Sequence, residues 1–260
     1  MLQKNNTNEP SPLARVMMEY LDCPCHFFPA QREDTAILTA WEESQRRGDR
    51  EGFVPVLVTV NKALWESLRM NACDEGEDLY RFDMGQVKRY RQKVLGAALP
   101  DAGEVLERYL PFCPSQVQKW VKTPVPAIIP EGEPSCSFWG YKNFTTGMTQ
   151  PLLLAEIPTA KAWNVFAWLP FGGWNCCPDT PALMAVTRRW RKRYGAVPAV
   201  ISSDILEYRV PFPASPETAW ELAREQSIFC PDSLDAGAEA PLSKLAADLV
   251  GAAVWSFWWD

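Results

Sequence analysis

Residues 52–60 read Gly-Phe-Val-Pro-Val-Leu-Val-Thr-Val, and this stretch decides the fold class. Its β-branched side chains are apolar at odd and even positions alike, which is typical of a strand covered on both faces. Pro55 stands near the start of the strand, where a missing N–H is tolerated. Asn61 follows as the N-cap of a short helix that carries Leu64 and Leu68 on its apolar side. A strand covered on both faces and flanked by helices predicts an α/β protein.

The N-terminal half around this strand is predicted to be a helix-rich α/β region. One helix is expected over residues 34–48, with Glu side chains early, Arg side chains late and Gly48 as its terminator. Two more helices are expected near residues 84–95 and 102–109. The passage 123–137 is rich in Pro, Gly and Ser and predicts a domain boundary.

Three segments follow from this boundary. Residues 1–22 are polar and are expected to form a disordered tail, residues 23–125 an N-terminal α/β region, and residues 150–260 a C-terminal domain.

The C-terminal half shows alternating strand and helix patterns. Strands are predicted at 152–157 and 162–169, a helix capped by Thr180, a hairpin from 198–201 and 205–210, helices at 215–227 and 242–250, and a last strand at 254–259. The last strand carries large aromatic side chains on both faces, so we expect it to be central and buried. This order predicts a mixed, partly antiparallel sheet covered by helices.

Composition excludes several functional classes. The chain has 260 residues, 47% hydrophobic and 22% charged, with 12 Trp, as expected of a globular protein with a heavy aromatic load. A net charge of -6 and a pI of about 5.1 argue against general nucleic-acid binding. The first residues lack the pattern of a secretory signal, and the longest apolar stretch, residues 249–259, is about half of what a membrane-spanning helix needs. We therefore expect a cytoplasmic protein that binds neither nucleic acid nor membrane and has eight free thiols.

Four sequence signatures occur together in the C-terminal half. They are Pro170-Phe171-Gly172-Gly173-Trp174-Asn175-Cys176-Cys177-Pro178, Arg193-Tyr194-Gly195-Ala196-Val197-Pro198, Ala223-Arg224-Glu225-Gln226 continuing to Phe229-Cys230-Pro231-Asp232, and Trp255-Ser256-Phe257-Trp258-Trp259-Asp260. With these signatures, residues 150–260 resemble a bacterial family known as domain of unknown function 4253, whose members commonly end in Trp-Trp-Asp. The resemblance implies a single fold for this half and a cytoplasmic bacterial setting, and it implies no reaction.

The chain departs from that family in two places. Cys176 stands where an acidic residue is expected, and residues 233–236 replace a more polar stretch. Those positions are therefore less suited to an essential role. An aromatic-Cys-Pro motif also occurs twice, at residues 112–114 and 229–231, and we interpret the repetition as coincidence because the surrounding sequences do not align.

The turn Gly172-Gly173-Trp174-Asn175 is the leading candidate for a binding site. We expect an exposed, shaped turn at the end of the 162–169 strand, because two glycines allow backbone conformations closed to other residues. The free amides of the helix that follows favour a carboxylate or phosphate there. An equally weighted alternative is that the glycines only fold Trp174 into the core, with Asn175 capping the turn.

Candidate catalytic residues are Cys177, beside a helix N-terminus that would stabilise a thiolate, and the carboxylate Glu225. Asp232 and Asp260 are further binding candidates near the signatures. The ordinary alternatives are a buried cysteine held in a turn, and carboxylates that cap helices or pair with Arg188 and Arg209.

Two other clusters of residues are interpreted as structural rather than functional. His26 is the single histidine, in Cys23-Pro24-Cys25-His26, and the short gap between the cysteines does not suit a zinc site, so we predict no metal and no cofactor. The basic and aromatic residues of the 188–194 segment are those of a solvated helix face.

The leading functional hypothesis is a non-catalytic protein that binds a partner protein or small ligand, with a toxin-neutralising immunity role as one version. The alternative is a thiol- or carboxylate-dependent hydrolase that uses Cys177 or Glu225. A pocket that contains both Cys177 and Glu225, together with a perturbed pKa, would favour the enzyme, whereas a flat exposed aromatic patch without convergent polar groups would favour binding. The most informative observation is whether these two residues share one cleft with Asn175, Asp232 and Asp260.

Overall fold

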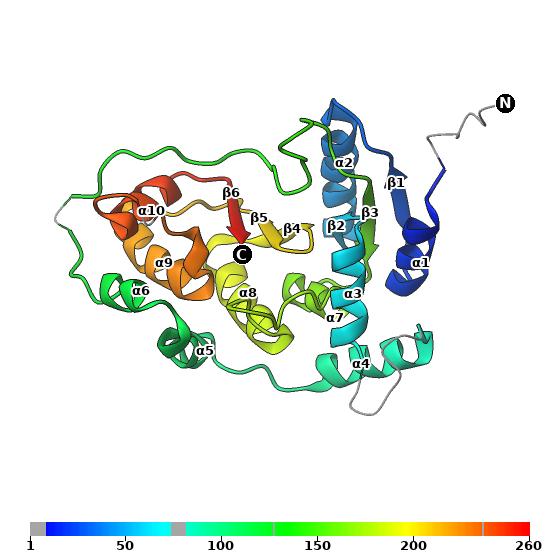
Figure 1. Ribbon diagram of the computed structural model, residues 1–260, viewed down its shortest axis with the longest axis horizontal. Helices are drawn as coiled ribbons and strands as arrows, with labels where there is room; N and C mark the ends of the chain where they lie inside the picture. The colour runs from blue at the N-terminus through cyan, green and yellow to red at the C-terminus, as the bar shows by residue number, and fades with distance from the viewer. Residues whose placement is uncertain (1–8, 74–81, 127, 236) are drawn as a thin grey trace. The chain divides into compact units, whose positions relative to one another are not determined.

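A computed structural model describes residues 9–73, 82–126, 128–235 and 237–260. This part of the chain contains ten α-helices and six strands, which confirms the mixed α/β class (Figure 1). It packs as two compact units. The chain enters each unit more than once. The first comprises Met1–Leu95, Trp139–Phe171 and Ala199–Ser203, and the second comprises Gly96–Phe138, Gly172–Pro198 and Asp204–Asp260.

The first unit is built on a mixed sheet in the order β1-β3-β2-β4. Its strands are β1 (Cys25–Phe28), β2 (Val54–Thr59), β3 (Leu152–Ile157) and the end of β4 (Val197–Ile201). β3 lies antiparallel to both β1 and β2, and β2 pairs in parallel with β4 through Leu57↔Val200 and Val58↔Ile201. All six residues of β2 are buried, as its apolar sequence predicts.

Helices surround this sheet. They are α1 (Pro12–Leu21), α2 (Thr35–Glu51), α3 (Lys62–Asn71), α4 (Met84–Gly96), α7 (Val165–Trp168) and the 3₁₀ turn η2 (Ala162–Asn164). α2 packs against β2 and β3 (Figure 1). The Asn61 side chain caps α3 by accepting from the Leu64 N–H, as predicted.

Three predictions in this unit are corrected. Pro12–Leu21 was placed in a disordered tail but forms α1, because Ser11 caps it and its apolar side packs inside; residues 1–8 lie outside the described residues. α2 continues past Gly48 and ends at Gly52, which adopts a left-handed conformation. The predicted strand 162–169 is η2 followed by α7. Residues 165–169 are all buried, so the order of their side chains does not distinguish a polar face from an apolar face, and a helix cannot be told from a strand.

The second unit contains helices that pack around an aromatic core. They are α5 (Ala102–Tyr109), α6 (Ser115–Trp120), α8 (Thr180–Tyr194), α9 (Pro216–Phe229) and α10 (Pro241–Leu249), with the 3₁₀ turns η1 (Leu110–Phe112) and η3 (Pro231–Ser233). α9 packs against α10, and α5 packs against α8 and α9. The cap of α8 is Asp179 rather than Thr180, because the Asp179 carboxylate accepts from the Ala182 N–H at 2.9 Å.

The strands β5 (Ile205–Arg209) and β6 (Val254–Trp258) pair in antiparallel register in this unit. Among the described strands β6 pairs with β5 alone, so the expectation of a central strand is wrong. On the other side of β6, the N–H groups of Ala253 and Val254 both donate to the carbonyl of Ser135. Trp258 is 42% exposed, whereas Trp255 and Phe257 are buried as predicted.

Trp190 of α8 is the centre of the aromatic core. Its ring stacks on Phe257 at 5.4 Å between centroids and meets Phe229, Trp255 and Tyr208 edge-on at 4.9, 5.5 and 5.8 Å. All five side chains are buried. Edge-on and offset contacts are the favoured geometries of aromatic pairs, so this cluster ties α8, α9, β5 and β6 together.

Candidate functional site

The turn between α7 and α8 has the shape that its glycines imply. A Cβ atom at residue 172 would collide with the carbonyl oxygen of Pro178, so only glycine fits there. Gly173 has a φ of 88°, and its N–H donates to the carbonyls of Cys177 and Pro178 at 3.2 and 3.1 Å. Asn175 also has a positive φ, 46°, which asparagine tolerates better than most residues. Gly173 and Asn175 are exposed, whereas Gly172 is buried.

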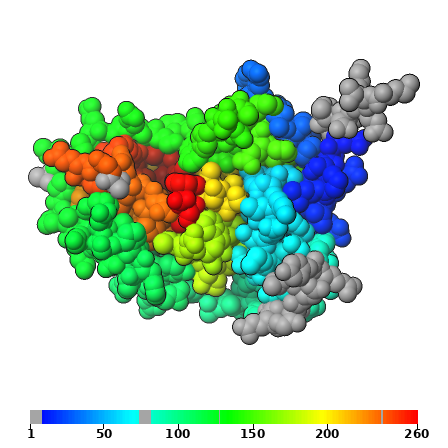
Figure 2. Space-filling model, viewed as in Figure 1, coloured from blue at the N-terminus to red at the C-terminus, as the bar shows by residue number. Residues whose placement is uncertain are grey.

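Three predicted binding residues come together beside this turn. The Asn175 Nδ2 donates to the main-chain oxygen of Asp260 at 2.8 Å, and the Asp260 N–H donates to the Asp232 carboxylate at 3.3 Å. Asp232 lies in η3, directly after α9. Figure 2 shows the last residues of the chain, in red, at the surface between orange and yellow-green segments of the same unit. The side chains of Asp232 and Asp260 are exposed and add negative charge to this surface.

A small pocket of about 130 Å³ opens next to Asn175. The residues that line it are Tyr109, Phe112, Cys113, Asn175, Cys176, Ile228 and Pro231. They come from the end of α5 with η1, from the turn, and from the junction of α9 with η3. The lining is mainly apolar, with the Tyr109 hydroxyl accepting from the Asp179 N–H at 3.1 Å. The pocket therefore fits one apolar side chain or a small apolar group.

The aromatic-Cys-Pro motifs both contribute to this pocket. Phe112 and Cys113 belong to the first motif and Pro231 to the second. The Cys113 thiol also donates to the Ile228 carbonyl at 3.7 Å. Sequence reasoning missed residues 109–113 as part of the site, although the repeated motif was a signal that pointed to them.

Cys177 has surroundings that disfavour a thiolate. The side chain is buried, and this burial, reinforced by the nearby Cys230, raises its pKa well above that of an ordinary thiol. Burial likewise raises the pKa of Cys230 to about 12 and that of Cys113 to about 11. These three thiols are thus protonated at neutral pH and act as small packing groups.

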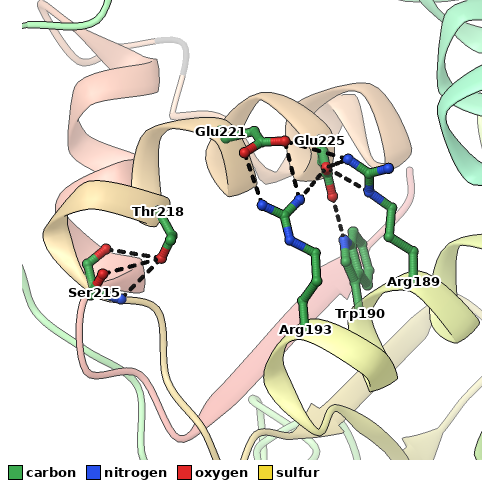
Figure 3. Close-up of polar contacts among 7 residues, drawn as sticks. All are labelled: Arg189, Trp190, Arg193, Ser215, Thr218, Glu221 and Glu225. Carbon is green, nitrogen blue, oxygen red and sulfur yellow. Dashed lines mark hydrogen bonds and ion pairs between the residues drawn. The ribbon is translucent and has the colours of Figure 1, made fainter.

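Glu225 is engaged in an ion-pair network between α8 and α9 (Figure 3). Its Oε1 atom accepts from Arg189 Nε at 2.8 Å and from Arg193 Nη1 at 3.1 Å, and its Oε2 atom accepts from Trp190 Nε1 at 2.8 Å. The side chain is only 7% exposed. These hydrogen bonds hold the Glu225 side chain in one position, and the carboxylate in turn orients the Trp190 indole.

The arginines predicted to pair with the candidate carboxylates, Arg188 of α8 and Arg209 of β5, have other partners. Glu225 pairs with Arg189 and Arg193, whereas Arg188 donates to the Pro100 carbonyl at 3.1 Å and Arg209 to the Ala253 carbonyl at 2.9 Å. The C-terminal part of α8 lies close to the acidic side chains of α9, so Arg189 and Arg193 are the arginines that reach Glu225. Two of the cations on the predicted solvated face are therefore held in ion pairs.

Acid should weaken the contribution of Glu221 to this network. Arg193 hydrogen-bonds to Glu221 and holds the pKa of that carboxyl below its ordinary value. A lowered folded-state pKa gives stability that is complete above the unfolded pKa, about 4.3, and is lost as the pH falls below it. We expect Glu221→Gln to be less stable than the wild type at pH 7, with the difference shrinking as the pH falls through the lowered folded-state pKa of Glu221, measured by urea unfolding. The exposed Glu42→Gln is the control, and a difference that grows in acid would contradict the assignment.

The part of the chain that contains the turn and the Glu225 network matches a known family. Residues 153–260 match the family described as Domain of unknown function (DUF4253). The DUF4253 match begins within β3 and includes the turn, the Glu225 network and the Asn175–Asp260–Asp232 contacts. Residues 109–113 lie outside it. No curated protein and no solved structure matches the chain. In the described residues, no helix has both the length and the apolar character needed to cross a membrane.

Proposed function

We propose that this protein is a non-catalytic binding protein that holds a basic and apolar segment of a partner protein at the pocket beside Asn175. The observation that carries the proposal is Phe112, which lines the pocket and is 77% exposed. Large apolar side chains at the rim of a pocket are typical of protein-recognition surfaces, where aromatic residues contribute much of the binding energy.

Charge around the pocket defines the partner. Asp179 and Asp232 are exposed and border pocket residues, and Asp260 joins them through Asn175. These three carboxylates outnumber the Arg108 guanidinium, which lies 5.6 Å from the Tyr109 ring centroid, so the rim attracts cations and repels acidic partners. The net charge of -6 acts in the same direction over longer distances. A partner segment with a lysine or arginine next to an apolar residue could pair its cation with the carboxylates and place its apolar side chain in the pocket.

The surroundings of the catalytic candidates support binding over hydrolysis. A thiol nucleophile needs a lowered pKa, and the pKa of Cys177 is raised. A general base needs an accessible carboxylate, and the oxygens of Glu225 accept from two arginines and a tryptophan. An immunity-type protein that neutralises a basic toxin is one form of this proposal, because acidic rims suit basic partners.

The test uses random peptides displayed on phage and selected against the full chain. We expect selected peptides to contain Lys or Arg next to an apolar residue. Phe112→Ser should weaken the best peptide at least about tenfold, measured by fluorescence anisotropy, because the aromatic rim of the pocket is lost. Asp232→Asn should weaken it less, and affinity should fall between about 50 and 300 mM salt.

Phe144→Ser is the matched control, because Phe144 has the same 77% exposure and does not line the pocket. It should leave affinity unchanged. Selection of acidic peptides, or binding that survives Phe112→Ser, would reject the proposed surface.

A further inference from the structure

Cys23 and Cys25 lie side by side where α1 leads into β1. Their Sγ atoms are 4.0 Å apart, and both side chains are half-buried. Cys23 lies in the bend that follows α1 and Cys25 is the first residue of β1, so the bend brings both thiols to one face. Small solutes can therefore reach a pair of sulfur atoms that already face each other. This pair is independent of the pocket beside Asn175.

The backbone holds the pair from both ends. Asp22 ends α1 in a left-handed conformation with a φ of 51°, and its N–H donates to the Met18 carbonyl. Pro24, between the two cysteines, accepts from the Glu156 N–H at 2.9 Å, and Cys25 pairs with Ala155 in the sheet. The two sulfur atoms are thus positioned by a helix end and a sheet rather than by a loose loop.

The two thiols differ in their readiness to ionise. The hydrogen bond between the two thiols, in which either sulfur can donate, lowers the pKa of Cys25. The same hydrogen bond, together with burial, raises the pKa of Cys23, and the Asp22 carboxylate adds to that effect. Arg91, which lies against the rings of Tyr20 and Trp168, acts in the opposite direction and lowers the pKa of Cys23. The lowered pKa of Cys25 makes it the better nucleophile of the pair.

We propose that Cys23 and Cys25 form a dithiol that closes to a disulfide on reaction with a peroxide. The Cys25 thiolate attacks one peroxide oxygen, an S–O bond forms, the O–O bond breaks, and the leaving oxygen takes a proton to become water or an alcohol. The Cys23 sulfur then attacks the Cys25 sulfur, an S–S bond forms, and the hydroxyl leaves with the Cys23 proton as water. The two thiols are oxidised and the peroxide is reduced.

A metal site is a poorer account of the same residues. Within the described ranges no group of three or more His, Cys, Asp and Glu side chains could hold a metal ion. The His26 ring lies against Phe28, at 4.5 Å between centroids, instead of joining the two sulfur atoms.

The experiment treats the reduced full chain with hydrogen peroxide at pH 7, followed by alkylation and trypsin digestion. Residues 16–32 form one tryptic peptide that contains both cysteines. We expect this peptide to lose about 2 Da in mass and to become resistant to alkylation. Its oxidation should be at least about tenfold faster than the oxidation of Cys136. Cys136 is the matched control because it is exposed and has no second cysteine beside it in the sequence.

Two variants separate the steps. Cys23→Ser should stop the reaction at a sulfenic acid on Cys25 that dimedone traps, and Cys25→Ser should abolish the fast phase. Both should keep the wild-type circular dichroism spectrum, because neither side chain is fully buried. Oxidation of Cys136 at the same rate, or no dimedone adduct in folded Cys23→Ser, would overturn the proposal.

Discussion

Trp190→Ala is expected to leave the protein without a cooperative unfolding transition at 25 °C. Replacing a large buried aromatic by alanine costs about 3–5 kcal/mol, against a total stability of about 5–15 kcal/mol. Trp190 touches four aromatic rings from three elements, so the cavity would lie at the centre of the core. The substitution also removes the indole N–H that Glu225 accepts, which adds the cost of a buried carboxylate with one partner fewer.

Trp190→Phe separates the two causes. Phenylalanine keeps an aromatic ring against Phe257 but cannot donate to Glu225, so we expect a smaller loss of about 1–3 kcal/mol. Urea unfolding followed by far-ultraviolet circular dichroism measures both variants, and it avoids the mixed fluorescence of 12 tryptophans. An alanine variant as stable as the phenylalanine variant would show that the ring contacts do not hold the unit together.

Deletion of residues 255–260 is the second change for which we expect loss of folding. It removes Trp255, Phe257 and Trp259, which are all buried, and it leaves β5 without its antiparallel partner. It also removes the Ser256 hydroxyl that donates to the fully buried Glu207 at 2.8 Å. A buried carboxyl group that loses a hydrogen-bond partner is destabilising, so the effects act in the same direction.

Two milder changes control for this deletion. Trp258→Ser alters a partly exposed side chain, and removal of Asp260 alone breaks only the contacts to Asn175 and Asp232. Both should stay folded and lose no more than about 1 kcal/mol. Thermal unfolding distinguishes the outcomes, and a deletion variant with an unchanged transition would show that β6 is dispensable.

Local signals in the sequence predicted most helices and strands. Asn61 and Ser215-Pro216 mark helix starts, and Gly195 ends α8, because capping needs only neighbouring residues. The same Ser-Pro signal begins α1 at Ser11-Pro12, where the polar residues that precede it favour a disordered tail over a helix. The segment 162–169 was misread because a short, fully buried apolar run has no distinguishing period.

The pocket was less predictable than the turn. Gly172 and Asn175 are of residue types that tolerate unusual backbone conformations, so the sequence predicts a defined turn at these positions. The approach of Cys113 to Ile228 joins residues more than 100 positions apart, and it depends on how α5 packs against α9. Packing of that kind depends on the shapes of whole helix faces, which no local pattern contains.

The position of β3 bears on how the chain folds during its synthesis. β3 pairs with both β1 and β2, yet α3, α4, α5 and α6 lie between β2 and β3 in the chain. On the ribosome, β2, whose residues are all buried in the folded unit, therefore has no antiparallel neighbour until residues 152–157 have been synthesised. Contacts over such long sequence separations form slowly, and an unpaired apolar strand invites aggregation in the meantime. The first unit is thus expected to fold only after more than half of the chain has emerged, and nascent chains stopped before residue 152 should bind chaperones.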